Sequence, residues 1–282
     1  IATGGIVDGS AGPGSIAGDD FIKLIRDAYE DESIRALVLR VDSGGGSAYA
    51  SEVIADELEK FKSSGRPIVA SMGGVAASGG YYISAPANQI FAEPHTITGS
   101  IGVGGFIPTF ERALDQIGIH EDGYSTVDTT TSVAKTLTEK DKKLMQSGTD
   151  LVYKKFITKV AENRNMTIDE VDKIARGKVW IGQKALEIGL VDQLGTLAEA
   201  IDKAAELAEL EKDTFGVKTI DRESPFEKIL GIPLAKIAIG IINIMGIDIN
   251  NSSLKVLNIL KNRTDELNSY NDPRGIYMNC FC

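Results

Sequence analysis

The first ninety residues alternate apolar runs with glycine-rich breaks. Residues 34–41 and 68–70 are apolar runs of the kind found in strands that are buried on both faces of a parallel sheet. Each run is followed by a glycine-rich turn, at residues 43–47 and 73–80, and then by a stretch with helical spacing. This repeated order of strand, turn and helix is typical of an α/β domain, in which chemistry gathers at the ends of the strands. We therefore expect the two turns to face one another across a single cleft.

The same periodicities predict further elements. The first 20 residues, which are rich in glycine, are read as a loop after a short strand. A long helix is expected at residues 139–163, with its apolar side chains turned inward. Those side chains are Leu144, Leu151, Phe156, Ile157 and Val160. Shorter helices are predicted at residues 20–29, 53–61 and 110–114 and after the capping box at 167–170, and a strand at 89–92.

Residues 229–249 form the most apolar long segment of the chain. Pro233, Lys236, Asn243 and Asp248 interrupt it, so the roughly 20 uninterrupted apolar residues of an ordinary transmembrane helix are not present. We expect a hydrophobic helix that packs against its own core or against another subunit. A helix that lies on a membrane surface is the alternative.

The composition and charge of the chain argue against some classes of function. With 43% hydrophobic and 25% charged residues, the 282-residue chain has the composition of a globular protein. Its net charge of −10, with lysines and arginines interspersed among acids, argues against a general nucleic-acid binder. The two cysteines, Cys280 and Cys282, do not make a zinc site by themselves, and no metal-ligand spacing is visible.

One serine stands among small residues at the end of the second glycine-rich turn. Ser78 is preceded by Ala76 and Ala77 and followed by Gly79 and Gly80. Small neighbours let a substrate backbone approach, and the start of the following helix offers unpaired N–H groups to a developing negative charge. A nucleophilic serine with an oxyanion hole needs this environment. The alternative is a tight turn with a capping serine.

Five ordered motifs and the end of the chain match one family. The matching segments are residues 39–47, 71–82, 98–103, 177–185 and 189–195, together with Tyr270–Arg274. On these motifs the chain resembles the bacterial signal peptide peptidase A family, also called protease IV. The resemblance implies an α/β fold of the ClpP/crotonase type, built from stacked ββα units, with a C-terminal helical extension.

We expect the chain to be organised in three parts. Residues 1–136 would form the crotonase-like catalytic core that carries the serine. Residues 137–210 would be a helical extension that completes the domain. Residues 211–282 would hold a linker, the hydrophobic helical segment and a tail.

The resemblance assigns roles to residues of both turns. The family's nucleophile falls on Ser78. The oxyanion donors would be backbone N–H groups, namely that of Gly79 and one from the Gly45–Gly46 turn. Gly44 stands where the family usually has proline, which loosens this turn but should leave its amides in place.

The sequence departs from the family pattern at the position of the general base. The family uses a lysine, which must be neutral to accept the serine proton and so needs a dry pocket that lowers its pKa. In single-repeat members it lies about ten residues before the stretch that here reads Leu137–Glu139, where this chain has Val127, Asp128 and Thr129. In two-repeat members, the first half donates the lysine and the second half donates the serine. We therefore read this chain as the second half of a two-repeat peptidase, with the lysine outside it.

Three residues of this chain are alternative candidates for the base. Lys135 is the lysine nearest to the expected place and is a weak candidate, because its charged surroundings favour a solvated side chain. His95, with Glu93 two residues away, is a formal candidate for a Ser–His–Asp arrangement, although a loop position at the rim also explains it. His120 stands in a polar loop and is expected at the surface.

The activity implied by the resemblance is that of a serine endopeptidase. It would cleave hydrophobic peptides, such as remnant signal peptides, through an acyl-enzyme and without a cofactor or metal. The family also implies a ring- or bowl-shaped homo-oligomer that includes the upstream half of the same protein, at the periplasmic face of the bacterial inner membrane. Two alternatives stay open: a crotonase-like acyl-CoA enzyme, and a non-catalytic subunit that supplies oligomer contacts. The isolated chain is expected to be nearly inactive, because its serine lacks a base.

Overall fold

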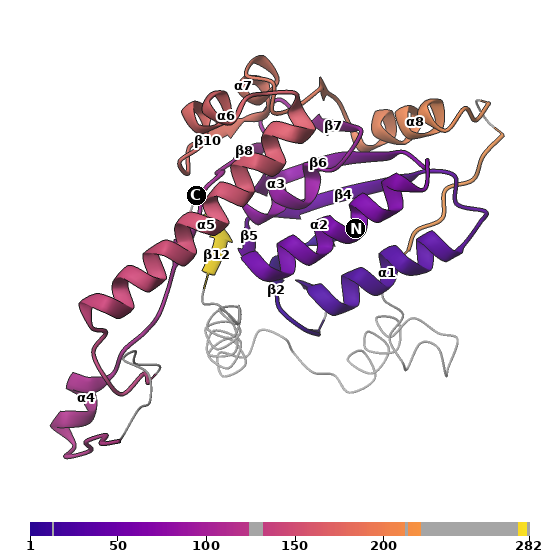
Figure 1. Cartoon of the computed structure of the whole chain (residues 1–282). Coiled ribbons are helices and arrows are strands. Elements are labelled where there is room, and N and C mark those ends of the chain that lie inside the picture. Colours follow the sequence, from indigo (N-terminus) through magenta and orange to yellow (C-terminus); the bar gives the residue numbers. More distant parts are fainter. Residues whose placement is uncertain (13, 124–131, 212–213, 221–275, 281–282) are drawn as a thin grey trace, which may run out of the picture.

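The computed structural model describes residues 1–12, 14–123, 132–211, 214–220 and 276–280 (Figure 1). In this part of the chain, a mostly parallel seven-stranded sheet has the strand order β1-β4-β6-β7-β11, with β8 paired to β6 and β10 paired antiparallel to β8. The α/β architecture predicted from the sequence is confirmed. The strands are β1 (Ala2–Thr3), β4 (Leu37–Ser43), β6 (Ile68–Ala77), β7 (Gln89–Ala92), β8 (Ile97–Gly99), β10 (Val179–Ile181) and β11 (Gln193–Leu194).

A second, smaller sheet lies beside the first. Its order is β3-β2-β5-β12-β9, and β12 joins it from the far end of the chain. The expectation of a loop after one short strand in the first 20 residues was wrong, because β1, β2 and β3 all lie there. Strand β1 pairs with β4, β2 pairs with β5, and β3 pairs with β2. The strands are β2 (Gly5–Val7), β3 (Ser15–Ala17), β5 (Gly45–Ser47), β9 (Gly104–Gly105) and β12 (Ile276–Asn279).

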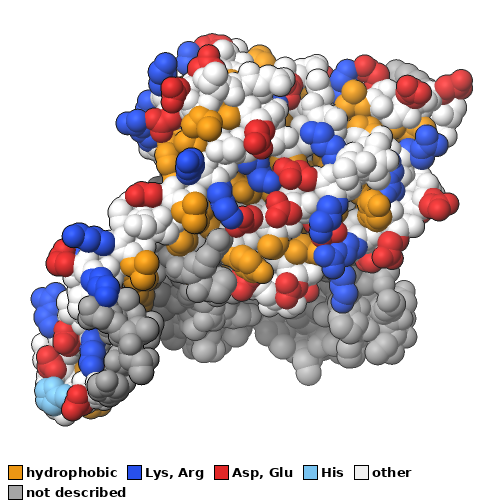
Figure 2. Space-filling view, in the orientation of Figure 1, with side chains coloured by type: hydrophobic (Ala, Val, Ile, Leu, Met, Phe, Trp, Pro, Cys, Tyr) orange, Lys and Arg blue, Asp and Glu red, His pale blue; other side chains and the backbone are white. Residues whose placement is uncertain are grey.

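Helices cover the large sheet on both sides. Figure 1 shows α1 and α2 next to one another on one face, with α8 on the other side of β6 and β4. The face seen in Figure 2 carries acidic and basic side chains interspersed, as the sequence indicated. The helices are α1 (Gly18–Glu30), α2 (Ala48–Ser63), α3 (Gly79–Ser84), α4 (Glu111–Gln116), α5 (Glu139–Arg164), α6 (Ile168–Ile174), α7 (Gly182–Glu187) and α8 (Leu197–Leu207).

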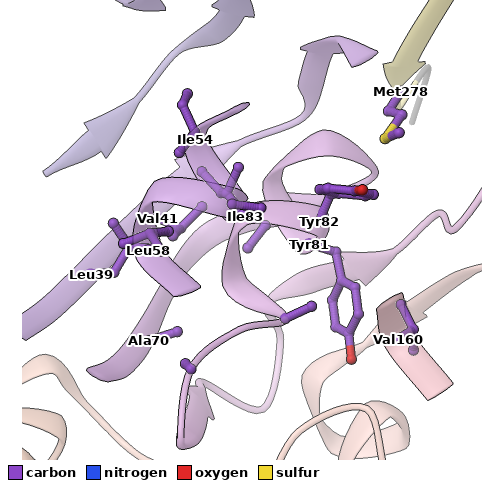
Figure 3. Packing of buried hydrophobic residues seen from close by; sticks show 14 of the residues in the cluster. Leu39, Val41, Ile54, Leu58, Ala70, Tyr81, Tyr82, Ile83, Val160 and Met278 are labelled. Carbon is purple, nitrogen blue, oxygen red and sulfur yellow. The ribbon is translucent and has the colours of Figure 1, made fainter. Parts of the chain in front are cut away.

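The position of β6 between two helical layers explains its apolar sequence. Ile68 and Ala70 belong to the main core cluster, in which side chains of β4, α2 and α3 meet (Figure 3). Val69, between them, belongs to a second cluster with Phe91 and with Ala200 and Ala204 of α8. Successive side chains of a strand point to opposite faces, so both faces of β6 require apolar residues.

Strand β6 is longer than the sequence indicated. It continues through Gly73 and Gly74 to Ala77, so most of the predicted second turn is strand and only Ser78 makes the turn. The pairing of β4 with β6 shifts register between Val41 and Ser43. The Asp42 carboxylate at this irregularity accepts a hydrogen bond from the Val75 N–H at 3.0 Å. This side-chain contact supports the strand past its two glycines, where the usual β-propensity is low.

Helix α5 extends beyond the sheets. Phe156, Ile157 and Val160 are buried as expected, but the prediction was wrong for Leu144 and Leu151, which are 62% and 59% exposed. Figure 1 shows that α4 and the N-terminal part of α5 project away from the body of the molecule. We call residues 106–123 and 132–151 the arm. The segment at residues 229–249 lies outside the described residues.

An ion pair with a buried arginine side chain joins α5 to the segment before β11. The Arg164 guanidinium, whose side chain is 7% exposed, donates to both carboxylate oxygens of Asp192 at 2.7 and 2.8 Å. Asp192 also accepts from the Ile90 N–H at 2.7 Å, and Arg164 donates to the Gly189 carbonyl at 2.9 Å. Asp192 therefore has a structural role.

Replacing Asp192 with alanine is expected to lower the free energy of unfolding by about 3 kcal/mol or more, because it leaves a buried guanidinium without its partner. Urea denaturation of the wild type and the variant measures this loss. Glu187→Ala is the matched control, since it removes a partner from the exposed Lys184–Glu187 pair, for which a loss below about 1 kcal/mol is expected. Equal losses in the two variants would contradict the assignment of the Arg164 pair as a buried stabilising contact.

Candidate active site

Ser78 sits at a sharp turn between strand β6 and helix α3. Its backbone angles are φ 54° and ψ −117°, a left-handed conformation that serine rarely adopts and that costs about 1–3 kcal/mol. Two hydrogen bonds hold it there: its N–H donates to the Gly99 carbonyl and its carbonyl accepts from the Tyr82 N–H, both at 2.8 Å. A strained strand-to-helix turn of this kind projects a nucleophilic side chain from the backbone.

The Ser78 hydroxyl has no hydrogen-bond partner within the described part of the chain, although the residue is only 1% exposed. Ser78 stands at the N-cap position of α3 but makes no capping hydrogen bond with its side chain. The alternative of a capping serine is therefore wrong. A buried hydroxyl without a partner costs about 1–3 kcal/mol, and such a cost calls for a functional explanation.

The two predicted turns are in direct backbone contact. A side-chain carbon added to Gly79 would lie 3.1 Å from the Gly45 Cα, and one added to Gly80 would lie 2.4 Å from the Ser43 carbonyl oxygen. The expectation that the two turns face one another is confirmed. Only glycine fits at these points, because any Cβ would push the turns apart.

Three buried serines hold the first turn. The Ser43 hydroxyl donates to the Gly4 carbonyl at 2.7 Å and accepts from the Gly45 N–H at 3.1 Å. Ser47 caps α2, since its hydroxyl accepts from the Ala50 N–H at 3.1 Å. The third, Ser51, donates to the Ser47 carbonyl at 2.8 Å.

The sequence reading did not single out these serines. The role of Ser47 as a helix cap could have been predicted, because a serine directly before a helical stretch is a common N-cap. The contact between Ser43 and Gly4 joins residues far apart in the chain and leaves no local signal. Since the Gly45 N–H is directed to Ser43, Gly46 and Gly79 are the stronger candidates for oxyanion donors.

Strand β12 passes through the site, which the sequence did not predict. Its pairing with β5 is antiparallel and sets Met278 opposite Gly46. The Met278 carbonyl oxygen lies 1.9 Å from where a Cβ on Gly45 would be, and 3.0 Å from where one on Gly79 would be. A peptide carbonyl therefore lies between the glycines that the sequence proposes as the oxyanion site.

The two candidate bases, Lys135 and His95, lie in loops. The arm carries the half-buried Lys135, next to Glu111. Hydrogen bonds from Thr136 lower the pKa of Glu111, and the charge of Lys135 lowers it further. His95 is exposed, as a loop residue at the rim would be. Within the described residues, neither Lys135 nor His95 is hydrogen-bonded to the Ser78 hydroxyl.

The structure also places His120, the second of the two histidines. His120 is 72% exposed, and its Nδ1 lies 3.0 Å from an Asp115 carboxylate oxygen, so its expected surface position is confirmed. Residues 127–129, where single-repeat members carry the lysine, lie outside the described part of the chain. The described residues thus provide no visible proton acceptor for Ser78.

A cavity of about 670 Å³ lies elsewhere, between α1, α8 and residues 214–220. Phe21, Leu197 and Phe215 are among the residues that line it, and none of the predicted site residues does. Within the described residues, no cluster of three or more His, Cys, Asp or Glu side chains could hold a metal ion, and no helix is long and apolar enough to span a membrane. The site is therefore defined by Ser78 and the two turns.

Comparison with known proteins agrees with this geometry. Residues 60–211 match the model of the protein family described as Peptidase family S49. The matched residues include Ser78 and the elements on either side of it. The chain belongs to peptidase family S49. The α/β architecture with its parallel sheet fits the ClpP/crotonase-like fold of this family, and the resemblance drawn from the sequence motifs is confirmed.

Relatives of this S49 chain carry protease names. Over 99% of its length it is 42% identical to Protease 4 of Salmonella typhi, and over 98% it is 38% identical to Protease 4 of Haemophilus influenzae. It is also 34% identical, over 70% of its length, to the putative signal peptide peptidase SppA of Enterococcus faecium. The chain spans 45% of the length of each Protease 4 relative, so it corresponds to less than half of those proteins.

Proposed function

We propose that this S49 chain carries the nucleophile of a serine endopeptidase and receives its general base from outside the described residues. The observation that carries the proposal is the buried, unpartnered Ser78 hydroxyl on a strained turn, next to the glycines of the first turn. Strain and an unmade hydrogen bond both cost stability. A nucleophile that must be free to attack accounts for both costs at once.

In the proposed reaction, the Ser78 Oγ attacks the carbonyl carbon of a peptide bond, and a neutral lysine takes the hydroxyl proton. The carbonyl oxygen becomes an oxyanion, which the backbone N–H groups of Gly79 and Gly46 stabilise. The lysine then returns the proton to the leaving amine, and the acyl-enzyme on Ser78 is hydrolysed by water. In the two-repeat arrangement that we infer, the lysine comes from the upstream half of the longer protein.

The proposed substrates are extended hydrophobic peptides, such as remnants of signal peptides. The support comes from the strand that passes through the site, in which Ile276 and Met278 are 8% and 1% exposed and contribute to the hydrophobic core. A peptide bound in the same way would place alternate side chains in apolar surroundings. The name of the relative in Enterococcus faecium is consistent with such substrates.

For assembly, we propose a homo-oligomer that includes the upstream half, at the periplasmic face of the bacterial inner membrane. Apolar side chains on the arm support subunit contacts, because large exposed apolar patches mark interaction sites. Figure 2 shows hydrophobic side chains on the side of the molecule along which α5 runs. The exposed apolar residues of the arm are Phe106, Ile107, Phe110, Ile117, Ile119, Val133, Leu144 and Leu151.

The alternative functions are less well supported. A crotonase-like acyl-CoA enzyme would use the paired amides for a thioester enolate but has no use for a free serine hydroxyl at this point. A non-catalytic subunit would have no need to hold Ser78 in a strained conformation. The peptidase proposal explains both features of Ser78.

Labelling with a fluorophosphonate tests the proposal. In the longer protein that contains the upstream half, the reagent is expected to label Ser78, and mass spectrometry of the labelled peptide identifies the residue. The isolated 282-residue chain is expected to be labelled at least about 100-fold more slowly, because general-base catalysis contributes that much or more. A longer protein that is neither labelled nor active on peptides contradicts the peptidase proposal. Rapid labelling of the isolated chain contradicts the external base and favours Lys135 or His95.

A further inference from the structure

We propose that Asp42 and Thr96 are positioning residues for Ser78. Together they hold a bulge in strand β6, at residues 73–75, and the bulge sets Ser78 beside the glycines of the first turn. The inference rests on the proposed peptidase function, because it takes Ser78 as the nucleophile. It deepens that function by naming side chains outside the two turns on which the alignment of the nucleophile depends.

The bulge gives strand β6 two more residues than its neighbour β4 has over the same stretch. Val41 pairs with Met72, and Ser43 pairs with Ala76, so two steps along β4 match four steps along β6. The registers of β6 with β4, β7 and β8 all pass over the two glycines of the bulge within the described chain. Extra residues of this kind bend a strand and change the direction of the side chains that follow.

The two extra residues decide where Ser78 lies along the sheet. An extended strand advances by about 3.3 Å per residue, so pairing without the bulge would carry Ser78 about 7 Å further along the sheet relative to Ser43. With the bulge, the start of α3 meets the first turn, and a Cβ on Gly79 would lie 3.1 Å from the Gly45 Cα. A misplacement of 1 Å can cost about 100-fold in rate. Even a partial relaxation of the bulge would therefore misalign Ser78 with the proposed oxyanion donors.

The Asp42 side chain holds the bulge from the side of β4. Its Oδ1 atom accepts a hydrogen bond from the Val75 N–H at 3.0 Å. Three atoms of the same side chain lie 3.0–3.2 Å from where a Cβ on Gly73 would be, so a larger residue at Gly73 would push Asp42 away from the strand. The carboxylate thus takes the place that a carbonyl of β4 would have in a regular ladder.

Thr96 holds the bulge from the opposite side. Its hydroxyl donates to the Gly73 carbonyl at 2.8 Å and accepts from the Glu93 N–H at 3.0 Å, and the residue is only 2% exposed. Thr96 lies between β7 and β8, which pair with β6 before and after the bulge. Its hydroxyl therefore bridges the point at which β6 changes its partner strand.

Asp42 also connects the bulge to the first turn. Its backbone carbonyl accepts from the Gly4 N–H at 3.0 Å. The next residue, Ser43, donates to the Gly4 carbonyl and accepts from the Gly45 N–H through its hydroxyl. Asp42 thus bonds to the strand that carries the nucleophile and stands next to the serine that holds the first turn. This position couples the two elements that the proposed reaction needs in register.

Asp42→Ala tests the inference in the longer protein that contains the upstream half. The rate of fluorophosphonate labelling of Ser78 is expected to fall about tenfold or more. Asp42 is exposed, so the variant leaves no cavity in the core. Asp42→Asn should restore labelling to within about threefold of the wild-type rate, because the amide oxygen can accept the same N–H.

Asp31→Ala is the matched control for Asp42→Ala. The Asp31 carboxylate also accepts a backbone N–H, that of Ser33, at 3.0 Å, and it accepts from Lys218 at 2.8 Å. These contacts involve neither β6 nor the first turn. The variant should therefore lose stability and keep the wild-type labelling rate.

Thr96→Val is a second test that does not depend on the folding of Asp42→Ala. It replaces the bridging hydroxyl with a methyl group of similar size, and labelling should slow about tenfold or more. Thr96→Ser keeps the hydroxyl and should label within about threefold of the wild-type rate.

Hydrogen exchange followed by mass spectrometry gives a readout that needs no chemistry. In peptides that cover residues 73–82, exchange is expected to be about tenfold faster in Asp42→Ala than in the wild type, because opening of the bulge frees amides of β6 and of the start of α3. Asp31→Ala should match the wild type in these peptides.

The combined results separate the inference from the proposed function. A wild-type labelling rate or unchanged exchange in folded Asp42→Ala would overturn the inference, as would a failure of Asp42→Asn to restore labelling. Faster exchange in Asp42→Ala without labelling of any protein, the wild type included, would overturn the proposed function and leave the role of Asp42 in the bulge standing.

Discussion

Replacing Ser78 with alanine is expected to lower the kcat/KM of the longer protein for peptide hydrolysis by about 10⁴- to 10⁶-fold, as loss of the nucleophile does in other serine peptidases. The free energy of unfolding should stay the same or rise slightly. The Ser78 hydroxyl is buried without a hydrogen-bond partner in the described residues, so its removal breaks no contact and relieves an unpaired polar group. Peptide hydrolysis and urea denaturation on the same preparations measure both effects.

Ser84→Ala provides the matched control on the same helix. The Ser84 hydroxyl is also buried, but it donates to the Gly80 carbonyl at 2.8 Å. Its removal should cost about 1 kcal/mol of stability and leave hydrolysis near the wild-type rate. The two serines thus predict opposite outcomes: activity is lost at Ser78 and stability at Ser84. If Ser78→Ala keeps substantial hydrolysis, the serine is not the nucleophile.

Replacing Gly45 with alanine is expected to lower kcat/KM by about 100-fold or more, which is the loss that follows removal of one oxyanion donor. The residue has a φ of +97°, and an added Cβ would lie 2.6 Å from the Gly79 nitrogen. The first turn must then move away from the start of α3, and the two proposed donor amides lose their common target. The affinity of a peptide aldehyde, whose adduct with the serine needs both amides, should fall in parallel.

Gly65→Ala is the control that separates the loss of oxyanion stabilisation from the effect of backbone strain. Gly65 also has a positive φ, of +84°, but no atom lies within 4 Å of its missing Cβ. The left-handed conformation should cost both variants about 1–2 kcal/mol of stability, and Gly45→Ala should lose more because its Cβ meets backbone atoms. Only Gly45→Ala should lose catalysis. Equal activity in the two variants at a temperature where both are folded would contradict the oxyanion assignment.

Much of the fold could be predicted from local patterns. Mostly apolar runs indicated buried strands: β6 and β7 contain all of the predicted residues, and β4 contains residues 37–41 of the run predicted at 34–41. The helices α1, α2 and α5 were also placed nearly correctly, because their apolar spacing and flanking residues are local signals. The boundaries failed where a long-range contact overrides local preference. Asp42 supports β6 through two glycines that read as a turn.

The candidate site was predicted only in part, because only some of its residues leave a local signal in the sequence. Ser78 and the glycines of the two turns stand out in the sequence because small residues are concentrated around them. The supporting serines and strand β12 do not stand out, since their roles depend on contacts with residues far away in the chain. The exposure of Leu144 and Leu151 was not predicted. Helical periodicity shows which side chains share one face of a helix, but it does not show whether another element covers that face.

By itself, the sequence determined that the chain has an α/β fold and that one serine lies at the junction of a strand and a helix among glycines. These features depend on the order of neighbouring residues, and neighbouring residues are what periodicity reports. Only the tertiary structure decided that the two turns touch, that the Ser78 hydroxyl has no partner among the described residues, and that the Met278 carbonyl lies between the glycines. Those facts arise when segments separated by many residues pack together, and no local pattern encodes the distance between them.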